Sequence, residues 1–254
     1  MRRVALLCTD TFSGRVVHHA LYEAFGDVAT IVEDRMDRAT LLRGRVRRLG
    51  LTPVLGQVLF LAALAPWLER ASAPRKDELV RRYRLHERAF RRSSRVPSVN
   101  TAEAREALKT ADPLVVVVMG TRIIGRETLR ATNATFVNLH AGITPYFRGG
   151  HGGYWALRER RPDLIGSTVH LVDEGIDTGG VLGRAYFQPS TEDSYATYPV
   201  HHLGVGVPQL ISAVSTILET GHPDVQADLD LPSRLWHHPS LGGYLYHRIW
   251  NGVK

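Results

Sequence analysis

Two polar side chains end an apolar segment in the second half of the chain, and their spacing suits catalysis. Residues 135–140 read Thr-Phe-Val-Asn-Leu-His, which predicts a β-strand with Asn138 and His140 at its carboxyl end. Because side chains two residues apart emerge on the same face of a strand, this amide and imidazole would lie side by side. Open α/β folds bind ligands at this end of their parallel strands. A turn-forming asparagine beside a buried structural histidine is the competing interpretation.

The segments that follow this strand combine a glycine-rich loop with a turn that carries a carboxylate. Residues 141–157 contain five glycines, which permit close approach of a ligand to the backbone. Residues 166–172 alternate in polarity like a strand, and residues 181–187 predict a returning strand. Asp177 lies on the turn between them.

The elements that must position these residues predict a Rossmann-like fold. Apolar runs at residues 3–8 and 28–32 flank a helical pattern that continues to Phe25. Residues 113–119 read Pro-Leu-Val-Val-Val-Val-Met, which is typical of a central parallel strand covered on both faces. Thr101 is suited to cap a helix just before that strand. We therefore expect an α/β fold with a mostly parallel sheet flanked by helices.

The composition is that of an ordinary globular protein. The 254 residues are 44% hydrophobic and 22% charged, enough to bury a full core. Cys8 is the single cysteine, so no internal disulfide forms, and its place at the end of an apolar run predicts a buried thiol. The first residues lack the long apolar run of a secretory signal, which favours a cytoplasmic setting.

The positive charge is confined to one segment. The whole chain carries a formal charge of +7, yet residues 32–95 hold 16 Lys and Arg against 7 Asp and Glu. Because the rest of the chain has no basic excess, we expect no nucleic-acid partner. Residues 34–95 predict a basic helical insertion, and residues 191–254 a short C-terminal helical extension packed on a catalytic domain of residues 1–190.

An uncharged stretch interrupts this basic insertion. Residues 49–68 contain no charged side chain and are flanked by arginines. A helix buried in the protein or in a homodimer interface is favoured, and peripheral membrane contact is the alternative. Pro53, Gly56 and Pro66 argue against a transmembrane span.

The histidine pairs lack the spacing of metal ligands, so no metal is predicted. These pairs are His18-His19, His201-His202 and His237-His238.

The motifs resemble the folate-dependent formyltransferases, the family that includes glycinamide ribonucleotide formyltransferase, methionyl-tRNA formyltransferase and the sugar N-formyltransferases. The resemblance is strong over residues 115–187 and covers the first 32 residues in outline. It rests on Asn138-Xaa-His140, Pro145-Tyr146-Phe147-Arg148-Gly149, Trp155-Ala156, Gly166-Xaa-Thr168-Xaa-His170 and Asp177-Thr178-Gly179.

The resemblance implies transfer of a formyl group from 10-formyltetrahydrofolate to a primary amine, with Asn138, His140 and Asp177 as the catalytic trio. The residues that it places around the pterin are Met119, Gly120, Thr121, Arg122, Ile123, Ile124, Val172, Asp173, Glu174, Gly175 and Ile176. Arg148, Gly149, Thr168 and His170 are candidates for contact with the small-molecule acceptor, and purely structural roles are the alternative for each.

The chemistry of formyl transfer agrees with this trio. Attack of a neutral amine on the formyl carbon puts negative charge on an oxygen, which Asn138 and a protonated His140 would stabilise as hydrogen-bond donors. Asp177 would orient His140, favour the imidazolium and accept the proton of the amine.

Departures from the family restrict the acceptor. The purine-pathway enzyme has a glycine-rich phosphate loop after its first strand, whereas residues 8–15 here read Cys-Thr-Asp-Thr-Phe-Ser-Gly-Arg. The C-terminal segment is too short for the RNA-binding domain of the transfer-RNA enzyme. A nucleotide- or lipid-linked amino sugar is the expected acceptor. Hydrolysis of 10-formyltetrahydrofolate and non-catalytic binding of folate or a nucleotide sugar are the alternatives.

Overall fold

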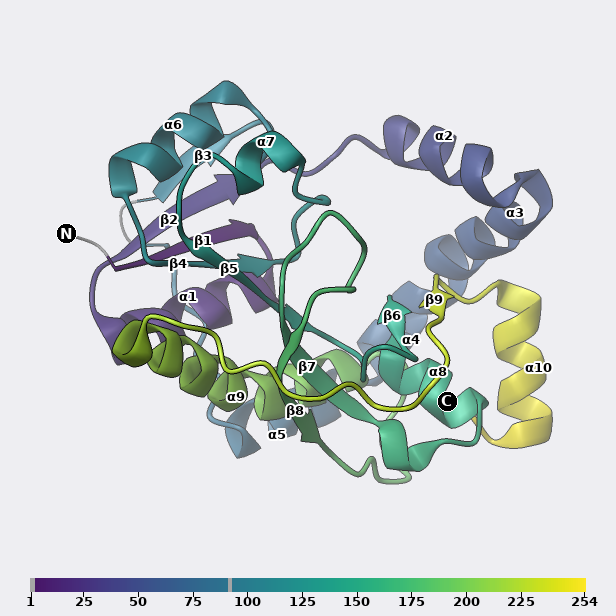
Figure 1. The fold of residues 1–254 in the computed structure, drawn as a ribbon. Helices are drawn as coiled ribbons and strands as arrows, with labels where there is room; N and C mark the ends of the chain where they lie inside the picture. The colour runs from purple at the N-terminus through teal and green to yellow at the C-terminus, as the bar shows by residue number, and fades with distance from the viewer. Residues whose placement is uncertain (1–2, 91–92) are drawn as a thin grey trace.

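A seven-stranded sheet forms the centre of the molecule (Figure 1). The computed structural model describes residues 3–90 and 93–254. Its strands are β1 (Val4–Thr9), β2 (Val28–Glu33), β3 (Ser93–Val96), β4 (Val115–Met119), β5 (Thr135–His140), β7 (Gly166–Leu171) and β8 (Val181–Tyr186). They are ordered β3-β2-β1-β4-β5-β7-β8, and β1 to β5 are parallel, whereas β7 runs antiparallel to β5 and to β8. The predicted Rossmann-like, mostly parallel sheet is confirmed.

Helices cover both faces of this sheet because successive side chains of its central strands point to opposite sides. Leu6 and Val117 face helices α1 (Phe12–Phe25) and α9 (Tyr198–Thr220) in one core, which also buries Cys8. Leu7 and Val116 face α6 (Ala102–Ala111) in the other core, and α7 (Arg126–Leu129) lies on the same side. Burial raises the pKa of the Cys8 thiol to about 12, so this cysteine is a packed core residue.

The basic insertion is helical, with one exception. It forms α2 (Arg38–Leu49), α3 (Leu51–Leu59), a π-helical turn (Phe60–Leu64), α4 (Ala65–Ala71) and α5 (Ala73–Arg82). The prediction of helices alone up to residue 95 is wrong at its end, where β3 pairs with β2 at the edge of the sheet. Three of the four side chains of β3 are exposed, so the strand lacks the apolar alternation by which a sequence reveals one.

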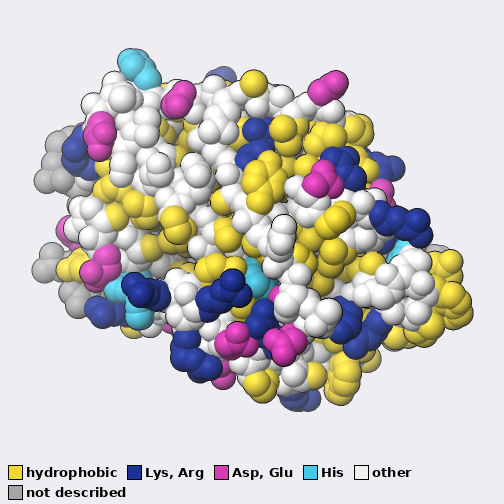
Figure 2. Space-filling view, turned by 90° about the horizontal axis from the view of Figure 1, so that it is seen from below, with side chains coloured by type: hydrophobic (Ala, Val, Ile, Leu, Met, Phe, Trp, Pro, Cys, Tyr) yellow, Lys and Arg dark blue, Asp and Glu magenta, His cyan; other side chains and the backbone are white. Residues whose placement is uncertain are grey.

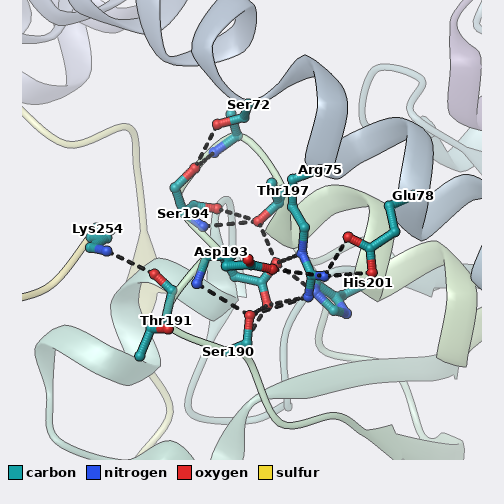
Figure 3. A network of polar contacts seen from close by, with 12 residues as sticks. Ser72, Arg75, Glu78, Ser190, Thr191, Asp193, Ser194, Thr197, His201 and Lys254 are labelled. Atoms are coloured by element: carbon teal, nitrogen blue, oxygen red, sulfur yellow. Dashed lines mark hydrogen bonds and ion pairs between the residues drawn. The ribbon is translucent and has the colours of Figure 1, made fainter.

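A buried polar network fastens this insertion to the sheet domain (Figure 3). Arg75 of α5 binds Asp193, with 3.0 Å between Nε and Oδ1, and the Asp193 side chain is fully buried. His201 of α9 contacts the same carboxylate at 3.1 Å. Ser72 and Ser194 are hydrogen-bonded 3.0 Å apart beside them. The position of α5 relative to α9 therefore depends on one buried carboxylate.

A third core joins the insertion to the C-terminal region. Phe60 and Leu68 pack with Phe147 of the glycine-rich loop and with Tyr244 of α10 (Leu241–Asn251). Helix α8 (Gly152–Arg158) follows the loop, then a 3-10 turn (Pro162–Leu164). The short strands β6 (Arg148–Gly149) and β9 (Leu235–Trp236) pair in parallel, so the tail is bound to the loop.

Two helical stretches in the described part of the chain, Leu51–Ala71 and Tyr198–Thr220, are apolar and long enough to cross a membrane. That criterion considers length and composition alone, and a core helix of a soluble protein also meets it. The second stretch is α9, which packs on the sheet. The first buries Phe60 and Leu68 but exposes Leu51 and Leu55, so only one side of it is covered by the rest of the protein.

Candidate active site

Four polar side chains gather where β5 and β7 pair. In this antiparallel register Asn138 lies opposite His170, and His140 lies opposite Thr168. Directly opposite residues of an antiparallel pair share a face, and so do residues two apart in one strand. The four side chains therefore emerge together at the carboxyl end of β5, next to the end of β4, close to the point where the strand order reverses between β1 and β4.

The turn after β7 brings Asp177 to this group. Its Oδ2 lies 3.3 Å from His140 Nδ1, and its Oδ1 lies 3.5 Å from Asn138 Nδ2. The backbone N–H of Gly149 donates to Oδ2 at 2.8 Å. Asp177 has a φ of 52°, in the left-handed region that few residues other than glycine adopt, and such backbone is common where a side chain serves a site. The structure thus brings the three predicted catalytic residues together.

The hydrogen bonds of His140 differ from those expected from the sequence. Its Nε2–H donates to the carbonyl oxygen of Phe147 at 2.7 Å, so this N–H is not directed at a substrate oxygen. Burial lowers the pKa of His140 below its ordinary 6.5, although the carboxylate of Asp177 opposes that shift. Both ring nitrogens face oxygen acceptors, the Phe147 carbonyl and the carboxylate of Asp177, so neither is directed at the substrate. Asn138 is then the side-chain donor available to a developing oxyanion.

Asp177 carries the negative charge of the site. Burial alone would raise its pKa, but the neighbouring imidazoles of His140 and His170 and the hydrogen bond from the Gly149 N–H lower the pKa to about 2. The carboxylate is therefore ionised at neutral pH and able to accept a proton during the reaction.

His170 positions the amide of Asn138. Its Nδ1–H donates to the Leu171 carbonyl at 2.7 Å, which leaves Nε2 to accept a hydrogen bond from Asn138 Nδ2 at 3.1 Å. The amide orientation is thereby determined, with the NH₂ group toward Asp177. The sequence placed His170 among the acceptor-contacting candidates, and its contacts assign it this positioning role.

The other three residues predicted to contact the acceptor have different surroundings in the structure. Thr168 is fully buried, and its hydroxyl donates to Gly142 O at 2.8 Å and accepts from Thr144 N–H at 3.1 Å, so it braces the loop. Arg148 donates to the carbonyl of Ile176 at 3.2 Å and links the loop to the Asp177 turn. Gly149 is the candidate of these three that lines a cavity.

Two cavities meet at His140. The first, of about 330 Å³, lies between the loop after β4 and the turn after β7. Every predicted folate-binding residue lines it except Glu174, which pairs with Arg126 at the surface. Asn138, His140 and Asp177 form its inner end. A concave cavity with apolar walls and backbone polar groups on both sides fits a planar heterocycle such as a pterin.

The second cavity, of about 770 Å³, opens on the other side of β5. Its walls come from the start of α1, from α4 and α5 of the insertion, and from the start of α9. It shares Met119, Leu139, His140 and Ala141 with the first cavity. Sequence reasoning missed these walls because they come from segments far apart in the chain, none of which carries a motif.

Fold and site define an α/β protein of the Rossmann-like class with a two-sided site. A family model described as formyl transferase matches residues 70–207, more than half of the chain. The chain therefore belongs to the formyl transferase family.

Individual relatives agree with this membership. The chain is 29% identical over 141 residues to a methionyl-tRNA formyltransferase of Anaeromyxobacter sp. (strain K), covering 53% of this chain and 44% of that protein. It is 34% identical over 100 residues to the enzyme of that name from Desulfotalea psychrophila, covering 39% of this chain and 31% of that protein. The chain thus spans less than half the length of these curated relatives.

Solved structures share the fold. A sugar N-formyltransferase from Shewanella sp FDAARGOS_354 aligns with a TM-score of 0.55 at 14% identity, over 91% of this chain and 75% of that one. Glycinamide ribonucleotide transformylase 1 from Symbiobacterium toebii aligns with a TM-score of 0.56 at 18% identity, over 87% and 89% of the two chains. At these identities the likeness shows the fold alone.

Proposed function

We propose that this protein is an N-formyltransferase that moves a formyl group from 10-formyltetrahydrofolate to a primary amine. The observation that carries the proposal is the meeting of two cavities at His140, with Asn138 and Asp177 beside it. A transfer between two substrates needs both reacting atoms at one point, and two cavities that share His140 in their common wall supply that point. The smaller cavity takes the pterin of the donor, and the larger one takes the acceptor.

The side chains suit the bond changes of this reaction. The amine nitrogen forms a bond to the formyl carbon, the carbonyl oxygen gains negative charge, and the bond from that carbon to N10 of the donor then breaks. Asn138 Nδ2–H stabilises the oxygen, and the ionised Asp177 accepts the proton that leaves the amine. That proton ends on N10 of the released tetrahydrofolate. His140, fixed by its hydrogen bond to the Phe147 carbonyl, lies with Nδ1 3.3 Å from the carboxylate of Asp177.

The larger cavity favours an acceptor without a phosphate beside the amine. The one lysine that lines it, Lys76, is paired with Glu69. Glu87 is paired with Arg15. Asp77 lines the cavity without an ion-pair partner among the described residues. These walls are neutral or acidic. They would not repel another small amine, or an amino sugar whose sugar ring enters the cavity first.

The test is incubation of the protein with 10-formyltetrahydrofolate and a panel of amino sugars and small amines, with release of tetrahydrofolate as the readout. Release that depends on one amine class supports the proposal. Release without any amine would show hydrolysis instead. Binding of folate without turnover under every condition would show a non-catalytic module. His140→Ala is expected to lose turnover and retain folate binding.

We also propose that helices α3 and α10 contact an anionic lipid surface. Leu51, Leu55 and Leu59 are 71%, 56% and 47% exposed along one face of α3, because they recur every four residues. Ile249 and Trp250 of α10 are 67% and 68% exposed. Figure 2 shows hydrophobic side chains gathered at the right-hand end of the molecule, where Figure 1 places these helices.

The charge of the insertion identifies this partner. No Asp or Glu occurs from residue 38 to residue 68, whereas Arg43, Arg47 and Arg48 of the adjoining α2 are exposed. Among the described residues no carboxylate pairs with these arginines. An apolar stripe beside them fits an anionic bilayer surface, where apolar burial and charge attraction both favour binding.

A further inference from the structure

A third cavity lies outside the two that meet at His140. It measures about 260 Å³ and is enclosed by α2 and α3 of the insertion on one side and by the tail at β9, His237 and His238 on the other. Gly149 and Ile176 line both this cavity and the smaller of those two. It therefore adjoins the proposed donor cavity rather than the acceptor cavity.

This third cavity is cationic. Of the residues that the structure describes, Arg45 and Arg48 line it and no Asp or Glu does. Among the residues that the structure describes, neither guanidinium has a carboxylate within ion-pair distance. Burial lowers the pKa of His151 to about 3, with His238, His202 and Arg45 adding to the effect. Burial and the charge of Arg45 likewise lower the pKa of His238 to about 4. The histidines are thus neutral, and the uncompensated charge is that of the two arginines.

An unpaired amide oxygen faces the same cavity. Gln57 lines it and is only 6% exposed, and its Oε1 has no hydrogen-bond partner. A buried carbonyl oxygen left without a donor costs free energy, so a ligand N–H is the expected partner. Trp236 and Leu49 supply apolar walls. The ligand that completes this set is an anion with an adjacent N–H group and a flat or apolar portion.

We propose that this cavity binds the glutamate tail of the folate donor. The tail joins an aromatic ring through an amide N–H to carboxylates that are ionised at neutral pH, and each of these groups has a counterpart here. The carboxylates bind Arg45 and Arg48, and the amide N–H donates to Gln57. The tail reaches the cavity past Gly149 and Ile176, which the two cavities share. This inference rests on the proposed function.

The experiment compares two stable ligands that differ only in the tail, 5-formyltetrahydrofolate and 5-formyltetrahydropteroate, the latter lacking the glutamate. Their Kd values are measured by calorimetry with the wild type, with Arg45→Gln/Arg48→Gln and with the control Arg43→Gln/Arg47→Gln. The control removes the same charge from the same helix but from residues that do not line the cavity. We expect the wild type and the control to prefer the tailed ligand by roughly 10- to 100-fold, the range of charge-assisted hydrogen bonds, and the Arg45/Arg48 variant to show a ratio of about one.

The tailless ligand separates the two proposals. Its binding to all three proteins with similar Kd supports the donor cavity whatever the tail does, and its failure to bind any of them contradicts the proposed function itself. Equal tail preference in all three folded proteins overturns the tail site. The wild type could also bind inorganic pyrophosphate through Arg45 and Arg48 and show no preference for the tailed ligand. That result would assign the cavity to a phosphate group and would also overturn the tail site. If the double variant fails to fold, Gln57→Leu, which removes the amide, is expected to reduce the preference severalfold, and an unchanged preference counts against the proposal.

Discussion

The carboxylate of Asp177 is held by groups from three segments of the chain. His140 comes from β5, His170 from β7, and the N–H of Gly149 from the glycine-rich loop. Their combined effect outweighs burial and keeps the pKa of Asp177 at about 2. A base that is ionised across the working pH range, beside a neutral amide donor, is what attack by an amine requires.

Replacing Asn138 by Ala tests the oxyanion donor. We expect kcat to fall by about 100-fold, because the donor acts on charge that develops only in the transition state. The Kd of 5-formyltetrahydrofolate should change little, which separates loss of catalysis from loss of binding. Glu174→Gln, on the same turn region but outside the cavity, is the control and should retain wild-type kcat. An unchanged kcat in Asn138→Ala would exclude the proposed role.

The pH dependence of kcat tests the charge states at the trio. The pKa of Asp177 is about 2 and burial lowers the pKa of His140 from its ordinary 6.5, so we expect neither group to govern the rate above pH 7. We expect kcat at saturating amine to be constant between about pH 7 and pH 8, while kcat/KM still follows ionisation of the free amine. A step in kcat near pH 7 in the wild type that vanishes in His140→Gln would contradict the lowered pKa of His140.

At the scale of elements, the junction of α5 with α9 shapes the acceptor cavity. Both helices contribute walls to it, and the buried Asp193 joins them through Arg75 and His201 (Figure 3). Burial alone would raise the pKa of Asp193, but the hydrogen bonds from Arg75, Ser190 and His201 lower it well below its ordinary range. The network therefore stabilises the fold as well as the cavity.

Asp193→Ala should destabilise the protein by about 3–5 kcal/mol in urea unfolding, because it leaves Arg75 nearly buried without its main partner. Glu192→Gln is the matched control: Glu192 also pairs with Arg75 but is 69% exposed, and its loss should cost less than about 1 kcal/mol.

The pH dependence of this difference has a definite sign. A carboxylate whose pKa is lowered by folding stabilises the native state above its unfolded value, here 3.8, and loses that contribution as the pH falls toward its folded pKa. The free-energy gap between the wild type and Asp193→Ala should therefore narrow below about pH 4. A gap that stays constant down to acid unfolding would indicate that packing, not charge, holds the junction.

At the scale of the whole molecule, the insertion and the C-terminal tail enclose the sheet domain from one end. They share a core with the glycine-rich loop and form the walls of the third cavity. Their outer surface is the apolar face of α3 and α10, with the arginines of α2 nearby. One end of the molecule thus combines a proposed ligand subsite with a proposed contact surface.

Flotation with lipid vesicles tests that surface. We expect the protein to bind vesicles that contain phosphatidylserine, to bind phosphatidylcholine vesicles weakly, and to lose binding as salt increases, since each arginine near an anionic surface contributes about 1 kcal/mol. Leu51→Ser/Leu55→Ser should abolish flotation without change in unfolding, and Leu114→Ser, an exposed leucine on the sheet side, is the control. A dimer in gel filtration that the Leu51/Leu55 variant splits, with no vesicle binding, would assign the surface to a second copy.

Local pattern was sufficient for the elements of the sheet domain and for part of the site. The run at 135–140 forms β5 with the predicted bounds, and the spacing of Asn138 and His140 places both on one face because a strand repeats every two residues. The segments predicted to surround the pterin follow the ends of strands, which is where open sheets bind ligands. The family motif and the position in the fold therefore predict the same site.

Tertiary structure decided the rest. The antiparallel register of β7 makes His170 a support for Asn138, and the hydrogen bond from His140 to the Phe147 carbonyl turns an expected oxyanion donor toward the protein. The acceptor cavity and the cationic third cavity draw their walls from separated segments. Short-range periodicity reports how a segment is buried, whereas charge states and cavities depend on which distant segments meet, and that is determined only when the cores pack.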